Sequence, residues 1–331
     1  MRTLIIAEAG VNHNGSLQLA KQLVDIACEA GVDIVKFQTF KAENLVTHTA
    51  VMADYQIQNL GQDSSQFDML KKLELSFRDF LELKAHCDQK GIEFISTPFD
   101  LESIDFLSQL NMKYWKIPSG ELTNLPYLEK IAKLEHPVIL STGMATMDEV
   151  RASYDILIKN GASEVFVLHC TSDYPTQFSD VNMNAMLSMK QEFGDNIGYS
   201  DHTQGILIPT VAVSMGAKII EKHFTISKTM EGPDHKASLE PSELKELVNN
   251  IRNIESCFGS FVKQPTLEEL NTRLVARKSI MASRKIEQGE TFTSENLSIK
   301  RPGSGISPMK WYEVIGQKAS RSFVKDELIE L

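Results

Sequence analysis

Two histidines at matching positions are the first residues in this sequence that could do chemistry together. The stretch Tyr199–Thr225 contains two short hydrophobic runs, and each run ends in a histidine, His202 or His223. A helical segment closed by Gly216 separates the runs, which predicts a strand–helix–strand unit. If the strands are parallel neighbours, they lie about 4.8 Å apart and present both imidazoles at the same end. Taken singly, either histidine could be structural; together they favour one shared metal ion or substrate.

Two lysines beside hydroxyl-rich turns suggest a second kind of chemistry. Lys36 and Lys116 follow short apolar runs, and a Ser119-Gly120 turn comes just after the second lysine. Cations, hydroxyl donors and glycines that let backbone amides approach closely suit a small polyanion carrying a phosphate and a carboxylate. A Schiff-base lysine is the competing catalytic role, and these residues do not decide between the two. The hydroxyl donors at the same predicted strand ends are Ser96, Thr97, Ser119, Ser141 and Thr142.

Several carboxylates could complete such a site. Glu8, Glu121 and Asp234 are candidates for general acid–base work or for binding hydroxyl groups. Glu221 lies two residues before His223 on the predicted strand, so the two side chains share one face. Two histidines are few for a structural zinc site, and they fit better an exchangeable ion such as Mn²⁺.

One repeating pattern would position all these residues. A short run rich in Val and Ile leads to a polar cluster and then to a helical segment that ends near a glycine. Ser16 caps one such helix and Gly31 stops it, and the helix Phe77–Lys90 stops at Gly91. The eight repeats predict a (β/α)8 TIM barrel over residues 1–258, with the active site at the carboxyl ends of its strands. An open doubly wound sheet is disfavoured because no GxGxxG loop follows the first strand.

Other segments depart from the repeat. A long polar insertion, which extends to about Leu75, follows the second strand. Residues 259–277 are polar and charged and predict a linker with some helix. Residues 278–331 predict a small domain with short strands. A module of about 55 residues has a marginal core by itself, so we expect it to pack on another surface.

Composition narrows the function classes. The 331 residues are 42% hydrophobic and 24% charged, as in folded proteins. A net charge of −10 argues against nucleic-acid binding. No apolar run approaches the roughly 20 residues of a membrane helix, and the first residues do not resemble a signal peptide. The four cysteines include no CxxC pair and predict buried thiols in a cytoplasmic protein.

At these motifs the chain resembles the sialic acid (nonulosonate) synthases along nearly its whole length. Residues 278–331, with Lys300-Arg301-Pro302, resemble the antifreeze-like (SAF) domain of these enzymes. Together the motifs are highly specific. The matching stretches are Ile6–His13, Lys36–Thr39, Ser96–Phe99, Lys116–Glu121, Ser141–Met144, His169–Thr171, Tyr174-Pro175, Ser200–Thr203, Lys222–Thr225 and Gly232–Asp234.

The resemblance implies an activity and a role for each motif. Such enzymes condense phosphoenolpyruvate with an open-chain N-acetylated mannose-type sugar and release phosphate. His202 and His223 match the metal ligands, usually of Mn²⁺, and Glu121 could shuttle a proton. The positions that hold phosphoenolpyruvate are matched by Lys36, Thr97, Lys116, Ser119 and Ser141, and Thr142 adds a hydroxyl beside them. Those around the metal-bound water and the sugar are matched by Glu8, Gln38, Tyr174 and Asp234.

The resemblance also implies a partner. Arg301 matches an arginine that the tail domain inserts into the barrel of a second copy, where it meets the acetamido group of the sugar. We therefore expect a homodimer with swapped tail domains.

The acceptor sugar and two other functions remain open at this point. The stretches Phe99–Ser103 and Asp234–Leu239 are more similar to the bacterial legionaminate synthases, which favours 2,4-diacetamido-2,4,6-trideoxymannose over N-acetylmannosamine. A Schiff-base or metal-dependent pyruvate aldolase is one alternative. A carbohydrate-binding protein built around the tail domain is another, but it leaves the polar strand ends unexplained.

Overall fold

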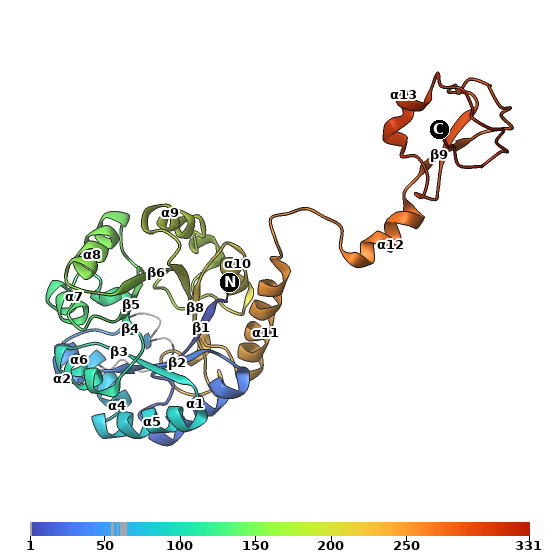
Figure 1. Cartoon of the computed structure of the whole chain (residues 1–331). Coiled ribbons are helices and arrows are strands. Elements are labelled where there is room, and N and C mark those ends of the chain that lie inside the picture. Colours follow the sequence, from blue (N-terminus) through green and yellow to red (C-terminus); the bar gives the residue numbers. More distant parts are fainter. Residues whose placement is uncertain (1, 54–55, 58, 60–64) are drawn as a thin grey trace. The chain divides into compact units, whose positions relative to one another are not determined.

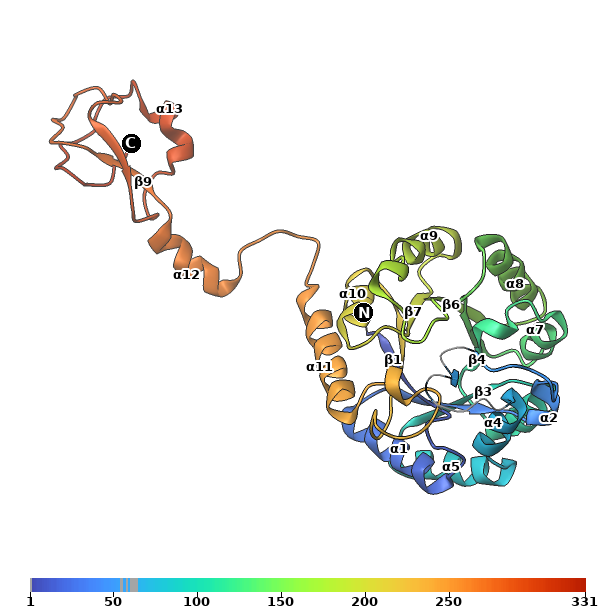
Figure 2. The same cartoon turned by 180° about the vertical axis from the view of Figure 1, so that it is seen from behind.

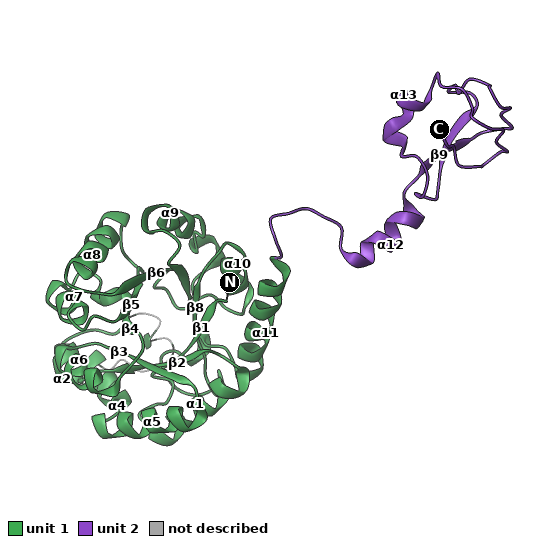
Figure 3. Cartoon of the chain, in the orientation of Figure 1, with its two compact units in different colours: residues 1–258 green, residues 259–331 purple. Residues whose placement is uncertain are grey.

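The chain folds into two compact units. The computed structural model describes residues 2–53, 56–57, 59 and 65–331. One unit comprises Met1–Phe258 and the other Gly259–Leu331 (Figure 3).

Eight parallel strands form the centre of the first unit. Their hydrogen-bonded order is β3-β2-β1-β8-β7-β6-β5-β4, so the first strand pairs with the last. The two strands at the ends of this order, β3 and β4, contact each other. Figures 1 and 2 show these strands inside a ring of helices from opposite sides, which confirms the predicted (β/α)8 barrel. The strands are β1 Leu4–Gly10, β2 Ile34–Thr39, β3 Glu93–Pro98, β4 Trp115–Ile117, β5 Pro137–Ser141, β6 Glu164–Cys170, β7 Ile197–Asp201 and β8 Ile219–His223.

The helices begin and end where side-chain caps and glycines direct them. Ser16 accepts a hydrogen bond from the Leu19 amide at the start of α1, and Gly31 ends that helix with a φ of 80°. Gly91 ends α5 in the same left-handed conformation, as predicted. No helix within the described residues is long and apolar enough to cross a lipid bilayer. The helices around the strands are α1 Leu17–Ala30, α5 Phe77–Lys90, α6 Leu101–Leu107, α7 Leu125–Ala132, α8 Met147–Lys159, α9 Asn184–Phe193, α10 Leu207–Ser214 and α11 Pro241–Cys257, with 3-10 turns η1 Ser108–Leu110, η2 Ser119–Glu121, η3 Phe178–Asp180 and η4 His235–Ala237.

Alternation along the strands separates the core from the barrel interior. Val35 and Phe37 of β2 belong to the main apolar core, and Phe37 stacks on Phe94 of β3 with ring centroids 6.1 Å apart. Lys36 and Gln38, which alternate with them, instead line a cavity. Successive side chains of a strand point to opposite faces, so this spacing places the polar residues inside the barrel mouth.

The insertion after β2 is polar in composition but packs through an apolar face. Its described residues include the helices α2 (Ala42–Leu45) and α4 (Gln66–Leu73). Met69 and Leu73 of α4 are buried against Val11 and Phe40 from the barrel. The sequence alone suggested only a polar segment; the structure makes it part of the wall above the strand ends.

The second unit contains a helix followed by a small β-rich module. The helix α12 covers Leu267–Ala276, and the strands β9 (Ser279–Ala282) and β10 (Leu297–Lys300) pair antiparallel, in agreement with the short strands expected in this domain. The 3-10 turn η5 (Pro308–Lys310) and helix α13 (Trp311–Val314) follow. The module has its own apolar core, built from Ile280, Ala282, Ile286, Phe292, Leu297, Val314, Ala319, Phe323 and Ile329.

Candidate active site

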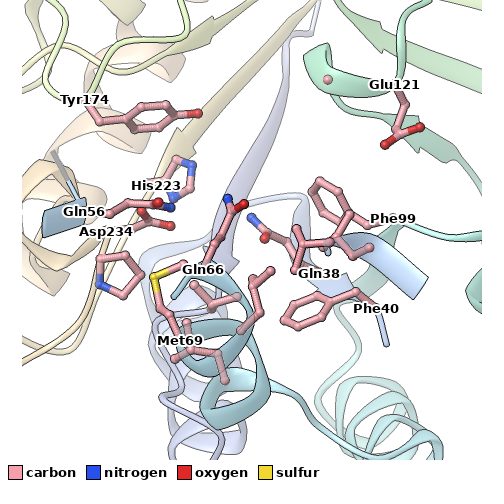
Figure 4. A pocket seen from close by; sticks show the side chains of 17 residues that line it. Gln38, Phe40, Gln56, Gln66, Met69, Phe99, Glu121, Tyr174, His223 and Asp234 are labelled. Atoms are coloured by element: carbon pink, nitrogen blue, oxygen red, sulfur yellow. The ribbon is translucent and has the colours of Figure 1, made fainter. Parts of the chain in front are cut away.

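A cavity with two connected lobes lies at the carboxyl ends of the barrel strands. The first, which we call the lysine lobe, has a volume of about 380 Å³ and contains Lys36 and Lys116. The second, the distal lobe, has a volume of about 340 Å³ and extends under the insertion. Both lobes are lined by Gln38, Gln66, Phe99, Gly120, Tyr174 and His223. Figure 4 shows the distal lobe, with Gln38 and Gln66 between His223 and Asp234 on one side and Phe40 and Phe99 on the other.

Lys36 is held by two buried carboxylates. Its Nζ lies 3.1 Å from Glu8 Oε2 and 3.4 Å from Glu221 Oε1, and it donates to Thr97 Oγ1 at 3.3 Å. Burial acts to lower the pKa of Lys36, but the charges of Glu221 and Glu8 outweigh burial and raise it above its usual value. Lys36 therefore stays protonated and is a poor amine nucleophile.

Lys116 has a weaker contact with carboxylates than Lys36 has. Its Nζ donates to Ser141 Oγ at 2.7 Å and to the Ile117 carbonyl at 3.1 Å, and Glu221 Oε1 is 3.9 Å away. Burial lowers the pKa of Lys116 to about 8, although Glu221 partly opposes the shift. A buried cation with no carboxylate in close contact gains by meeting an incoming anion.

Glu8 is placed for proton transfer. Its side chain is buried, and its Oε1 accepts a hydrogen bond from Gln38 Nε2 at 3.0 Å. Burial raises the pKa of Glu8 to about 7, against the opposing charge of Lys36. A carboxyl group that titrates near neutral pH can both take and release a proton.

The two histidines converge as the sequence predicted. β7 and β8 are parallel neighbours, and the rings of His202 and His223 have centroids 5.6 Å apart. His202 Nδ1 lies 2.6 Å from the Thr171 carbonyl oxygen, to which it must donate, so Nε2 is the ring nitrogen that remains to face a metal ion. Burial, followed by the charge of His202, holds the pKa of His223 well below its usual value, so His223 is neutral, as a metal ligand must be.

This pair fits a divalent metal ion that takes its other ligands from water or substrate. His223 Nδ1 is buried and has no hydrogen-bond partner among the described residues. Within the same residues no group of three or more His, Cys, Asp and Glu side chains is arranged to hold an ion. For such an ion the described residues offer the two histidine nitrogens, a set that suits an exchangeable ion better than structural zinc.

Three other predicted residues face the distal lobe. The ring of Tyr174 packs on His202 with centroids 4.0 Å apart. Asp234 is buried, and burial raises its pKa to about 6 even though His202 acts to lower it. Glu121 lines the distal lobe and accepts a hydrogen bond from Asn124 Nδ2 at 2.6 Å. Glu121 therefore lines the distal lobe and not the lysine lobe.

Ser119 is held at the edge of the lysine lobe by a backbone contact. The Gly143 amide donates to Ser119 Oγ at 2.9 Å, which orients the hydroxyl. A Cβ atom on Gly143 would lie 2.1 Å from Ser172 Oγ and 2.8 Å from Ser119 Oγ. A methyl group at this position would therefore displace the two hydroxyls.

One predicted residue, Thr142, is not brought to the cavity. The Thr142 hydroxyl donates to the Leu168 carbonyl at 2.9 Å, and the residue lines neither lobe. It follows the inward-facing Ser141 by one position, so strand alternation turns it away. Arg301 lies in the second unit, where it is exposed and its Nε donates to the Ala276 carbonyl at 3.0 Å.

The structure adds contacts and residues to which the sequence assigned no role. Glu221 lies between the two lysines and also accepts a hydrogen bond from Ser200 at 3.1 Å. Its strand position, two residues before His223, was the only signal available. The buried Cys170 thiol lies 3.8 Å from Ser119 Oγ and 3.9 Å from His202 Nδ1. The insertion contributes Gln66 and Met69, and nothing in its local sequence marks them as cavity residues.

Comparisons with known proteins show which family the chain belongs to. The model of the NeuB family matches residues 23–263, and that of the SAF domain matches residues 277–330. The chain is 51% identical to the N,N'-diacetyllegionaminic acid synthase of Campylobacter jejuni over 99% of both chains. It is 50% identical to that of Legionella pneumophila over 97% of this chain and 91% of the relative.

A solved structure is also similar. The crystal structure of N-acetylneuraminic acid (sialic acid) synthetase from Leptospira borgpetersenii, in complex with citrate, superposes with a TM-score of 0.72 at 34% identity. The match covers 82% of this chain and 90% of that chain. The chain therefore belongs to the NeuB family and carries a SAF domain at residues 277–330.

Proposed function

We propose that this protein condenses phosphoenolpyruvate with an open-chain N-acetylated mannose-type sugar and water, giving a nonulosonic acid and phosphate. The two-lobed cavity carries the proposal, because a lysine lobe suited to a small polyanion adjoins a distal lobe of different chemistry, with His223 lining both. The similarity to two N,N'-diacetyllegionaminic acid synthases favours 2,4-diacetamido-2,4,6-trideoxymannose over N-acetylmannosamine as the acceptor.

The residues of the lysine lobe bind and orient phosphoenolpyruvate. Lys116, Ser119 and Ser141 meet its phosphate and carboxylate, while Lys36 and Thr97 complete the polar wall. Carbon 3 of phosphoenolpyruvate forms a bond to the aldehyde carbon of the sugar. Water then adds to carbon 2, and the resulting tetrahedral intermediate loses phosphate with cleavage of the carbon–oxygen bond.

The buried carboxyl groups carry out the proton transfers. Glu8, with a pKa of about 7, accepts a proton from the attacking water. Asp234, with a pKa of about 6, lies in the distal lobe, where the oxygen of the aldehyde becomes a hydroxyl. An ion held by His202 and His223 would polarise the carbonyl as a Lewis acid. We propose that this ion is Mn²⁺.

Phosphate release provides the test of this function. The protein mixed with phosphoenolpyruvate, Mn²⁺ and either sugar is expected to release one phosphate for each nonulosonic acid formed. Absence of phosphate with both sugars would contradict the proposal.

A pyruvate aldolase is the second candidate, because the lowered pKa of Lys116 resembles that of Schiff-base lysines. Borohydride reduction in the presence of pyruvate distinguishes the two functions. A covalent adduct on Lys116 would support the aldolase, whereas the synthase forms none.

The substitution Gly143→Ala is expected to lower kcat/KM for phosphoenolpyruvate about 100-fold, since small displacements of positioning groups cost that much. The added methyl displaces Ser119 and Ser172. Steady-state kinetics checks the effect. The double variant Gly143→Ala/Ser172→Ala removes the closest clash and should regain part of the loss. An unchanged kcat/KM in Gly143→Ala would show that Ser119 does not orient substrate.

We further propose a homodimer in which Arg301 of one chain completes the site of the other. The second unit exposes large apolar side chains, among them Phe261, Leu267, Met309 and Tyr312, as expected of a surface that meets a partner. We place the reaction in the cytoplasm, where the four unpaired cysteines would stay reduced.

Mixed dimers test the exchange of Arg301. Arg301→Ala and His223→Ala are each expected to be inactive or nearly so as homodimers. After co-refolding, about half of the dimers are mixed, and each has one site with both residues intact, so activity should return to about a quarter of wild type. If mixing restores nothing while size measurements show mixed dimers, Arg301 does not act across the interface.

A further inference from the structure

One face of helix α4 forms a wall of the distal lobe. Gln66, Met69, Leu70 and Leu73 all line this lobe. Their spacing of three, four and seven residues places them on one side of the helix. The opposite side carries the exposed Asp68, Lys71 and Lys72. Helix α4 therefore presents three apolar groups and one amide to whatever enters the lobe.

The rest of the lobe has a matching character. Phe40, Phe99 and Val11 continue the apolar surface, and Gln38 supplies a second amide. The ionisable side chains of the lining are Glu121, Tyr174, His223 and Asp234, and the described lining residues include no lysine or arginine. A phosphate group would thus meet two carboxylates and no cationic lysine or arginine. A hydroxyl group against the apolar wall would lose its hydrogen bonds to water without replacement.

Position within the cavity indicates which part of a substrate enters the lobe. His223 and Gln66 lie where the two lobes meet, whereas Met69, Leu70 and Leu73 line only the distal lobe. A sugar whose reacting aldehyde is at His223 therefore extends its far carbons toward helix α4. Figure 4 shows Met69 and Gln66 reaching into this space from below.

We infer that helix α4 selects the acceptor by its far end, taking an uncharged sugar that has a methyl group in place of the terminal hydroxyl and carries a second acetamido group. Met69 packs against the methyl group, and the Gln66 amide hydrogen-bonds the second acetamido group. The Gln66 side chain makes no hydrogen bond to the described residues, so its amide is available to a ligand. This inference rests on the proposed condensation and assigns its acceptor specificity to two residues.

The test compares kcat/KM for 2,4-diacetamido-2,4,6-trideoxymannose and for N-acetylmannosamine in the same protein. Met69→Gln, which keeps the volume but adds polarity, is expected to lower the value for the trideoxy sugar about tenfold and to leave N-acetylmannosamine within about twofold. Gln66→Leu is expected to lower the value for the diacetamido sugar about tenfold. The KM for phosphoenolpyruvate should stay unchanged in Met69→Gln, because Met69 lines only the distal lobe.

Two further variants serve as controls. Met69→Leu keeps the apolar contact and should keep the wild-type preference, while Lys72→Gln changes the outer face of α4 and should change neither value. If Met69→Gln fails to fold, Gln66→Leu by itself is enough to test the inference. If the wild-type protein is active and both Met69→Gln and Gln66→Leu keep its preference between the two sugars, the inference is wrong. A wild-type protein that converts neither sugar would instead overturn the proposed function.

Discussion

Replacing His223 with alanine is expected to lower turnover by about three orders of magnitude and Mn²⁺ affinity at least about a hundredfold. His223 is one of two nitrogen ligands that the chain offers, and its buried Nδ1 has no hydrogen-bond partner among the described residues. Loss of a residue that only hydrogen-bonds a metal ligand costs about 10–100-fold in metal affinity, so loss of the ligand itself should cost at least the upper value. The drop in turnover corresponds to about 4 kcal/mol of lost carbonyl polarisation.

Direct metal binding, measured by titration calorimetry or by the paramagnetic resonance of Mn²⁺, separates this effect from misfolding. His169→Ala is the matched control, because His169 is also buried in a strand end but donates to the Val181 carbonyl at 2.7 Å and lines neither lobe. That variant should melt at a lower temperature yet bind Mn²⁺ normally. Wild-type affinity and turnover in His223→Ala would refute the ligand assignment.

Replacing Lys36 with methionine is expected to destabilise the barrel and to abolish phosphoenolpyruvate turnover together. The change leaves the buried carboxylates of Glu8 and Glu221 without their closest cation. Breaking a buried ion pair in this way costs about 3–5 kcal/mol. For a unit of this size such a cost lowers the melting temperature by about 10 °C. Turnover fails because the polar wall of the lysine lobe loses a fixed positive charge.

Thermal unfolding and steady-state kinetics measure the two effects of Lys36→Met separately. Lys41→Met is the surface control, because Lys41 pairs with Glu74 at 3.0 Å in a partly exposed position and should cost less than about 1 kcal/mol. The double variant Lys36→Met/Glu221→Gln removes the unpaired carboxylate charge of Glu221 and should recover stability but not activity. A stable, active Lys36→Met protein would mean that the lysine lobe does not hold an anion.

The barrel and most of its mouth follow from local sequence signals. Ser16 and Gly31 bound a helix, and His202 and His223 end successive apolar runs, because capping and short periodic patterns act over a few residues. Repeated strand–helix units then bring every strand end to one side, which is why Lys36, Lys116 and both histidines could be assigned to one cavity in advance.

Strand alternation explains one prediction that the structure does not support. Ser141 and Thr142 are both hydroxyl residues at the same strand end, yet only Ser141 faces the lysine lobe. The side chains of a strand alternate with a period of two residues, so these adjacent residues point to opposite sides. Both hydroxyls were expected at the same strand end, so the direction of the backbone had to decide between them.

The chain by itself determined the barrel, the histidine pair, the lysines and the second domain, since each depends on patterns within one or two consecutive elements. Only the tertiary structure placed Glu221 between Lys36 and Lys116, because three strands must close around them before the charges meet. Only the tertiary structure turned Gln66 and Met69 of a polar insertion into the wall of the distal lobe. Contacts between residues so far apart along the chain arise from packing, which no local pattern encodes.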